Sequence, residues 1–343
     1  MSAEATASAT HGYIVTIAGT QYGHVSPDSD SGFKGGVERV VVESHVDMIS
    51  VAEITFDLTV EWPFQIGDEV TVRVGGSSED DFCGIICAIR HHLARRTDSC
   101  TVVAMDALCK FASSRNTRVY EEMKDSDIIS DILGGDAGSI DSTSETHLYV
   151  HQRNESDLDF LKRLAARNGL LLSANREGKI DLGAPNFGTA VEVERTHVYK
   201  MSYTMSGSQV PPQVTVYGWD YVAKEMVEGT ASSVDPIGGG SSGLGVAGTI
   251  WQGDCYVSDF LVGSQGGAQS AADAELARMA RSFLRGSATV EGDGALRAGI
   301  MVKLKGFRDG FNPEAYVVAC RHVMEGRRGF LTELNFCANA FPT

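Results

Sequence analysis

The chain lacks an apolar run of about 18 residues, the length that a membrane-spanning helix needs, and its first residues have neither the basic nor the apolar region of a secretory leader. It also lacks an excess of positive charge, because 45 acidic residues outnumber 29 basic ones and give a net charge of −16. This balance argues against binding to a phosphate backbone by counterion release. Its seven cysteines are odd in number and scattered, which argues against a disulfide framework. We expect a reduced, globular, cytoplasmic protein without a membrane span or stable nucleic-acid binding.

Metal-binding and nucleotide-binding motifs of standard spacing are missing as well. His91 and His92 are adjacent in a predicted strand, where neighbouring side chains point to opposite faces. Cys83 and Cys87 lie four residues apart in the same strand and thus about 13 Å from each other, too far to share one ion. The sequence therefore predicts no metal site, no cofactor and no catalytic residue.

One glycine-rich stretch, "GGGSSGLGVAG" at 238–248, matches two enzyme motifs at once. Residues 239–243 fit the G-x-S-x-G of a nucleophile elbow, and 243–248 fit the G-x-G-x-x-G of a dinucleotide-binding turn. Both motifs need a strand before them and a helix after them. Here Pro236 precedes the stretch and "VAGTIWQGD" follows it, which does not suggest the start of a helix. We interpret the matches as chance in a chain with 38 glycines and predict a loop.

A second candidate site is the acidic cluster Glu155, Asp157 and Asp159, since paired carboxylates can act as general acid and base. The cluster lies at the start of "NESDLDFLKRLAARNG", however, where helix chemistry explains it. Ser156 followed by Asp159 resembles a capping box, acidic residues favour the first turn of a helix, and Gly169 is a typical helix end. We favour capping roles for Ser156, Asp159 and Gly169.

The order of the predicted elements divides the chain into β, α/β and β parts. Residues 1–117 contain short β-branched segments separated by turns, as in an antiparallel sandwich or barrel. Residues 118–192 are predicted to form a small α/β domain, and 193–228 with 268–343 a second β-domain. The segment between them, 229–267, is rich in glycine and serine and predicts a long loop. Three helices are expected, at 124–135, 154–169 and 270–286.

The strand ending in Gln and the following helix, "YVHQRNESDLDFLKRLAARNGLLL", resemble the late control protein D family of phage tail hubs. That family also covers the N-terminal hub portion of VgrG proteins from type VI secretion. The flanking segments "GDEVTVRV" and "AGIMVKLKGF" follow the same order, so the resemblance spans almost the whole chain. The residues that match the helix motif are Gln152, Glu155, Ser156, Asp157, Phe160, Leu161, Arg163, Leu164, Ala165 and Gly169.

The resemblance implies a mainly β protein in which two tube-like antiparallel β-barrel domains flank the small α/β domain. It implies a structural, non-enzymatic baseplate hub, in which three chains form a ring between a sixfold tail tube and a threefold spike. The partners implied are two further copies, the tail tube or a tube initiator, other baseplate proteins and the spike. Because the similarity ends near Thr343 without a spike domain, we expect the spike to be a separate protein. The hub would be made in the cytoplasm and then built into a baseplate.

The long loop gains a role in this interpretation. Trp251, Tyr256 and Phe260 are candidate anchors for a neighbouring subunit or baseplate protein. The alternative is a disordered surface loop without a partner. Two further functions stay open from the sequence: a VgrG-like secretion component that recruits effectors, and an enzyme such as a peptidoglycan hydrolase, although no motif supports the latter.

Overall fold

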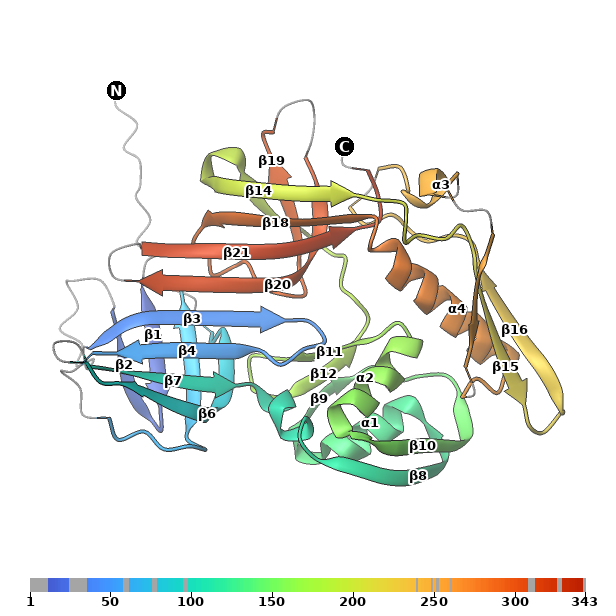
Figure 1. Cartoon of the computed structure of the whole chain (residues 1–343), viewed down its shortest axis with the longest axis horizontal. Helices are drawn as coiled ribbons and strands as arrows, with labels where there is room; N and C mark the ends of the chain where they lie inside the picture. Colours follow the sequence, from blue (N-terminus) through green and yellow to red (C-terminus); the bar gives the residue numbers. More distant parts are fainter. Residues whose placement is uncertain are drawn as a thin grey trace.

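The chain folds into a mainly β structure with four sheets and few helices in the part that the structure describes (Figure 1). In the described part, no helix is both long and apolar enough to cross a membrane. The computed structural model describes residues 12–24, 36–57, 62–75, 79–94, 98–238, 240–247, 249–250, 253–259, 261–307, 312–325 and 329–341.

One long sheet contains thirteen strands and includes both the first and the last strands of the chain. Its path runs in the order β14 (Val198–Met205), β18 (Leu284–Glu291), β21 (Gly329–Ala338), β20 (Glu314–Glu325), β3 (Val37–His45), β4 (Val51–Phe56), β7 (Ser99–Met105), β6 (Phe82–His92), β5 (Glu69–Val74), β1 (Tyr13–Ile17) and β2 (Thr20–His24). Beside this path, β13 (Val191–Glu194) pairs with β19 (Met301–Lys305), which pairs with β20. Within the described ranges the path stays open from β14 to β2, and no closed barrel forms.

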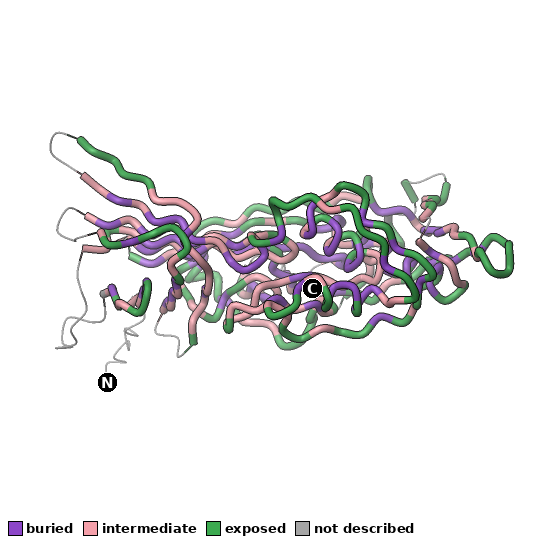
Figure 2. Tube along the Cα trace, turned by 90° about the horizontal axis from the view of Figure 1, so that it is seen from below, coloured by how far each residue is buried: buried purple, intermediate pink, exposed green. Residues whose placement is uncertain are grey.

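The two β regions meet where β3 pairs antiparallel with β20, from Arg39 opposite Glu325 to His45 opposite Ala319. Alternation along the strands supplies the buried side of the sheet, as in β4, where Ala52, Ile54 and Phe56 are buried and their neighbours are not. Two clusters result. One consists mainly of buried side chains from β1 to β7. The other consists mainly of buried side chains from β13, β14 and β18 to β21. Figure 2 shows the buried trace running through the long axis of the molecule.

The predicted small α/β region packs below the junction of the two β regions (Figure 1). Its elements are η1 (Ala107–Phe111), β8 (Arg115–Lys124), α1 (Asp125–Leu133), η2 (Gly134–Asp136), β9 (Ala137–Ile140), β10 (Thr146–Ser156), α2 (Asp157–Arg167), β11 (Leu171–Ala174) and β12 (Ile180–Gly183), followed by η3 (Arg195–His197). This region has its own core, the third cluster of buried residues in the protein, in which Phe160, Leu161 and Leu164 of α2 pack with Ile128 and Ile129 of α1. The helices predicted at 124–135 and 154–169 are present as α1 and α2.

The predicted boundaries of the third helix are wrong. The helix α4 spans Gln265–Ala280 and not 270–286. It begins earlier because the Ser264 hydroxyl accepts a hydrogen bond from the Gly267 amide (3.0 Å). It ends earlier because Leu284 is already the first residue of β18, where the chain pairs with β14 and β21.

The segment 229–267, predicted as one loop, contains regular structure. The short helix α3 (Leu244–Ala247) and the strand β17 (Cys255–Ser258) both lie in it. β17 runs parallel to β15 (Val214–Asp220), which pairs on its other side with β16 (Glu225–Ala231). This three-stranded sheet packs one face on α4, away from the long sheet (Figure 1).

A glycine allows the closest approach between α4 and this sheet. A Cβ atom on Gly229 of β16 would lie 2.1 Å from the carbonyl carbon and oxygen of Ala268. We expect Gly229→Ala to lower the free energy of unfolding by about 1–3 kcal/mol, because helix and sheet must separate to admit the methyl group. Urea denaturation followed by circular dichroism measures the loss.

The matched control is Gly253→Ala, since a Cβ there has no neighbour within 4 Å. Equal effects of the two substitutions would contradict the packing argument.

Candidate functional site

The residues of the helix motif form a hydrogen-bonded network where β8, β10 and α2 meet. Gln152, fully buried in β10, donates from Nε2 to Asp157 Oδ1 (2.7 Å). Asn116 of β8 donates to both oxygens of Asp157, at 2.9 and 3.0 Å. The carboxylate is therefore occupied by side chains of two strands, and it fixes the start of α2 against them. In the sequence, this contact corresponds to a Gln that is followed five residues later by an Asp.

The other polar residues of the motif also make local contacts. Ser156 Oγ accepts from the Asp159 amide (3.0 Å) and lies 2.7 Å from Asp159 Oδ2. Glu155, near the end of β10, forms an ion pair with Arg163 of α2 (2.6 Å). Gly169 follows the helix with a φ of 69°, a left-handed conformation that glycine adopts without strain. In this geometry the acidic cluster is engaged in capping and ion pairing.

A buried ion pair connects the two helices of the small region. Asp125, at the start of α1, accepts hydrogen bonds from Arg167 at the end of α2 (Nε to Oδ2, 2.7 Å) and from Asn168 (2.8 Å). His147 of β10 lies 3.3 Å from the same carboxylate. Burial alone would raise the pKa of Asp125, but the hydrogen bonds from His147 and Arg167 bring it down to about 2.

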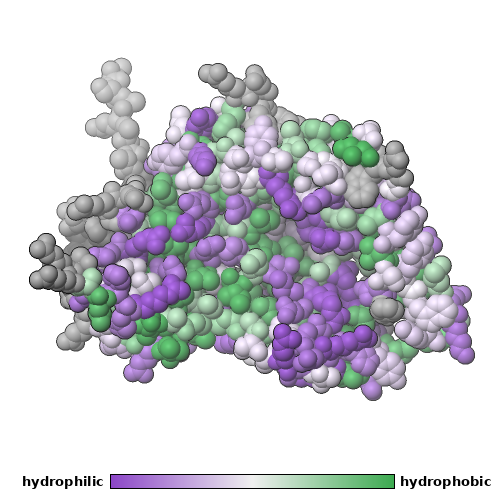
Figure 3. Space-filling model, in the orientation of Figure 1, coloured by the Kyte–Doolittle hydropathy of each residue, from purple (hydrophilic) through white to green (hydrophobic). Residues whose placement is uncertain are grey.

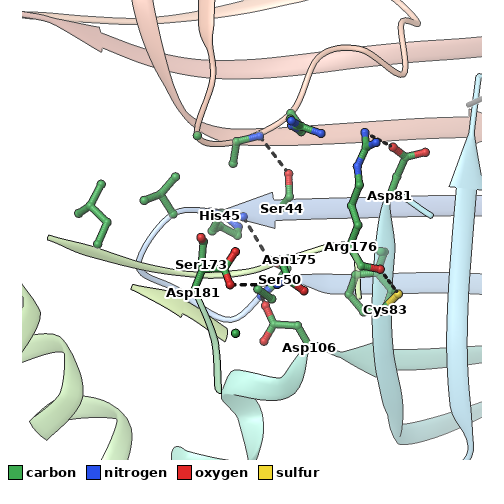
Figure 4. A pocket seen from close by; sticks show the side chains of 18 of the residues that line it. Ser44, His45, Ser50, Asp81, Cys83, Asp106, Ser173, Asn175, Arg176 and Asp181 are labelled. Carbon is green, nitrogen blue, oxygen red and sulfur yellow. Dashed lines mark hydrogen bonds and ion pairs between the residues drawn. The ribbon is translucent and has the colours of Figure 1, made fainter. Parts of the chain in front are cut away.

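A polar cavity of about 670 Å³ lies where the two β regions and the small α/β region meet (Figure 4). Ser44 of β3 accepts from the Ala298 amide (3.3 Å) and contacts the Cys320 carbonyl (3.4 Å). Arg176, in the turn between β11 and β12, pairs with Asp81 (3.5 Å), and its carbonyl accepts from the Cys83 thiol (3.0 Å). Most of these polar groups are paired across the boundary between the parts, so the cavity is best described as a junction.

Several titratable groups that line the cavity have shifted pKa values, and His322 and Asp106 are two of them. Burial lowers the pKa of His322 to about 4. Its ring lies 2.9 Å from the Leu296 carbonyl and 3.0 Å from the Thr332 hydroxyl, which suits a neutral imidazole that donates once and accepts once. Burial raises the pKa of Asp106 to about 6, although its carboxylate accepts from the Ser50 and Leu108 amides.

The histidines and cysteines weighed as metal ligands lie apart. His91 contacts the Trp62 ring, 5.2 Å between centroids. Cys83 bonds to a backbone carbonyl, whereas Cys87 lies 3.9 Å from Cys109, and a bulge after Ile86 breaks the regular alternation assumed for this strand. Across the described ranges, no group of three or more His, Cys, Asp or Glu residues could hold a metal ion.

The glycine-rich stretch is attached to the end of the chain. The Gly243 amide donates to the Asn339 carbonyl (2.8 Å), and the Phe341 amide donates to the Ser241 carbonyl (2.9 Å). A Cβ on Gly243 would lie 2.4 Å from the Phe283 ring. Close packing against Phe283 therefore requires a glycine at position 243.

Of the three predicted anchor residues, only Tyr256 can be placed. It lies on β17 and is 63% exposed, whereas Trp251 and Phe260 lie outside the described residues. The sequence reasoning missed its neighbours, Tyr217 and Trp219 on β15. Their spacing of two in "VTVYGWD" was the available signal that they share a face with each other.

The fold is shared with phage tail proteins. A tail protein of Neisseria meningitidis MC58 matches with a TM-score of 0.71 and 13% identity over 95% of this chain and 96% of that chain. The 43 kDa tail protein of prophage MuSo2 from Shewanella oneidensis matches with a TM-score of 0.69 and 13% identity over 95% and 98%. An Escherichia coli type VI secretion component, described as similar to the T4 tail proteins gp27 and gp5, matches with 0.60 and 13% over 96% and 76%.

Sequence comparison assigns the family. Residues 35–326 match the family model described as the Alg8 N-terminal domain, and the chain belongs to this family. A search of curated protein sequences finds no match. The resemblance to tail proteins predicted from the helix motif is thus confirmed at the level of the fold.

The buried ion pair supplies a test of the helix junction. We expect Arg167→Met to cost about 3–5 kcal/mol of unfolding free energy, because it leaves the Asp125 carboxylate buried beside a hydrocarbon chain. Arg163→Met removes an ion pair that is partly exposed and should cost about 1 kcal/mol or less. Chemical denaturation of both variants measures the difference. Similar losses would show that burial does not decide the strength of these pairs.

His322 predicts a pH dependence of stability. Its folded pKa is lowered, so the unfolded chain binds the extra proton and stability falls as pH drops from the unfolded value of 6.5 towards about 4. We expect the stability advantage of the native chain over His322→Gln to shrink by about 2 kcal/mol between about pH 7 and pH 5. The raised pKa of Asp106 acts in the opposite direction and cancels in this difference. Parallel curves for the two proteins would contradict the prediction.

Proposed function

We propose that the protein is a structural baseplate hub, which forms a trimeric ring joining a sixfold tail tube to a threefold spike. The observation that supports this proposal most directly is the long sheet, which has unpaired strand edges at both ends. It occurs in a chain whose fold matches tail proteins over nearly its full length. A ring needs an interface that is different on its two sides, so that each copy offers one side to each neighbour. The long sheet has such a pair of sides.

The first open edge is β14, which pairs with β18 on one side and with no described strand on the other. Tyr199 and Met205 on this edge are exposed. The path ends on its other side at β2, but the outer half of β6 is also unpaired on one side. Its neighbour β5 pairs with it only as far as Ile85, and residues 88–92 pair only with β7 within the described part. Unpaired edges of this kind accept a further strand. Pairing β14 of one copy with β6 of the next would close the sheet around a bore.

This proposal assigns a role to each part of the chain. Residues 1–117 form one tube-like β-barrel domain, and 193–228 with 268–343 form the other, so that three copies present six units to the tube. Residues 118–192 brace them from outside. The segment 229–267, including Trp251 and Phe260, contacts a neighbouring hub subunit or baseplate protein. In this scheme closure occurs between copies and not within one chain.

A second candidate is a secretion component that recruits effectors. The likeness to a type VI secretion component favours it, over 96% of this chain. Both candidate functions require the same ring of three chains. They differ in the proteins that bind to the outside of this ring, which are baseplate proteins for the hub and effectors for the secretion component. The genes beside this one discriminate them, since sheath, tube and spike genes favour the hub and effector genes favour the secretion component.

The proposed ring predicts a defined mass and a defined weak point. Light scattering of the purified chain alone should give three times 36.7 kDa, and with its spike protein it should give that mass plus the mass of the spike. Tyr199→Lys with Met205→Lys places charge on the β14 edge and should weaken trimer formation about tenfold or more, because buried lysines oppose strand addition.

The control is Tyr149→Lys, an exposed tyrosine on β10. It should leave the trimer intact. A monomer under both conditions, without and with the spike protein, would overturn the proposal.

A further inference from the structure

The sheet of β15, β16 and β17 has two unlike faces. Val214 and Val216 of β15 and Val227 of β16 pack on α4 and belong to one core cluster. Because side chains alternate along a strand, Tyr217 and Trp219 point to the opposite side. We call this side the outer face. It also includes Met226 and Glu228 of β16, which lie opposite Trp219 and Tyr217, and Tyr256 of β17.

Aromatic side chains form a row on the outer face. Tyr217 stacks on Tyr256, with 6.0 Å between ring centroids and 15° between planes. Trp219 and its cross-strand neighbour Met226 continue the row and are 44% and 60% exposed. In Figure 1 this face points away from the rest of the molecule, and Figure 2 shows the exposed hairpin at one end. Large exposed aromatics in one row are typical of an interaction surface.

Acidic residues outnumber basic ones in the strands and turns that form this sheet. The segments 214–231 and 253–259 contain a single basic residue, Lys224, and the carboxylates Asp220, Glu225, Glu228, Asp254 and Asp259. Glu228 is exposed on β16 and lies opposite Tyr217.

On the long sheet, by comparison, several acidic residues lie beside arginines. Glu43 and Glu333 both pair with Arg321, at 3.8 and 2.8 Å, and Glu53 pairs with Arg90 at 2.9 Å. The segments that build the three-stranded sheet are thus acidic overall, and Glu228 brings one of these carboxylates onto the outer face. Figure 3, coloured by hydropathy, shows pale and hydrophilic residues together at the end of the molecule where β15 and β16 lie.

We propose that the outer face binds a lysine- or arginine-rich segment of another protein of the tail. A guanidinium or ammonium group stacks favourably on Tyr and Trp rings, and Glu228 offers a carboxylate beside them. The same carboxylates repel an acidic partner, and a second copy of this chain would bring a like-charged face. Only the identity of the partner as a tail protein rests on the proposed hub function.

Oligo-arginine and oligo-glutamate of equal length, each carrying a fluorophore, test the chemistry of the face. Fluorescence anisotropy of the full chain, in the oligomeric state found by light scattering, should show binding of oligo-arginine only, weakening as salt is added. We expect Trp219→Ala with Tyr256→Ala to weaken that binding about tenfold, and Glu228→Gln about threefold. Circular dichroism confirms that the variants are folded.

The control is Tyr149→Ala, which removes a tyrosine of similar exposure (60%) from a different sheet. The proposal is overturned if this control loses as much binding as the double variant, or if neither loses any. It is also overturned if the double variant reduces the oligomeric mass, because the face would then be covered by a second copy. If the chain is monomeric both without and with the spike protein and still binds the peptide, the ring is refuted and this proposal stands.

Discussion

The antiparallel pairing of β3 with β20 is the contact on which the rest of the structure depends. It joins strands from opposite ends of the chain into one sheet. Because of it, Met324 and Phe330 complete the core of the first β region. The same pairing places Ser44 beside Ala298 and Cys320. It therefore forms the part of the junction cavity that Ser44 and Ala298 line. Without this pairing the long sheet would be divided into two separate sheets.

Polar residues in this protein serve mainly to hold elements together. Asp157, Asp125 and Asp106 each lie at the start of a helix, and each accepts hydrogen bonds from elements distant in sequence. Their environments shift the pKa of Asp125 and that of Asp106 in opposite directions, because only Asp125 has a cationic partner in direct contact. Acids with shifted pKa values are common in active sites, and in this protein Asp125 and Asp106 hold neighbouring elements together.

The parts of the fold that depend on local chemistry could be predicted from the sequence. The helix α2 has a cap at Ser156, acidic residues in its first turn, an apolar face and Gly169 at its end, and all these signals agree. The helix α4 has a weak pattern, because alanine and glycine fill most of its buried positions, and its boundaries were misplaced by five or six residues. The pairing of β3 with β20 has no local signal at all. Strand β17 is four residues long and pairs in parallel with β15 from a glycine-rich context, so it was assigned to a loop.

The separation of β3 and β20 along the sequence also has a consequence for biosynthesis. During translation, β3 leaves the ribosome long before β20, and its edge towards β20 stays unpaired until residues 314–325 have been made. Long-range pairings of this kind form slowly and leave an unpaired edge exposed while they do. A nascent chain of this protein therefore passes through a period in which the edge of its first β region is open to pairing with other strands.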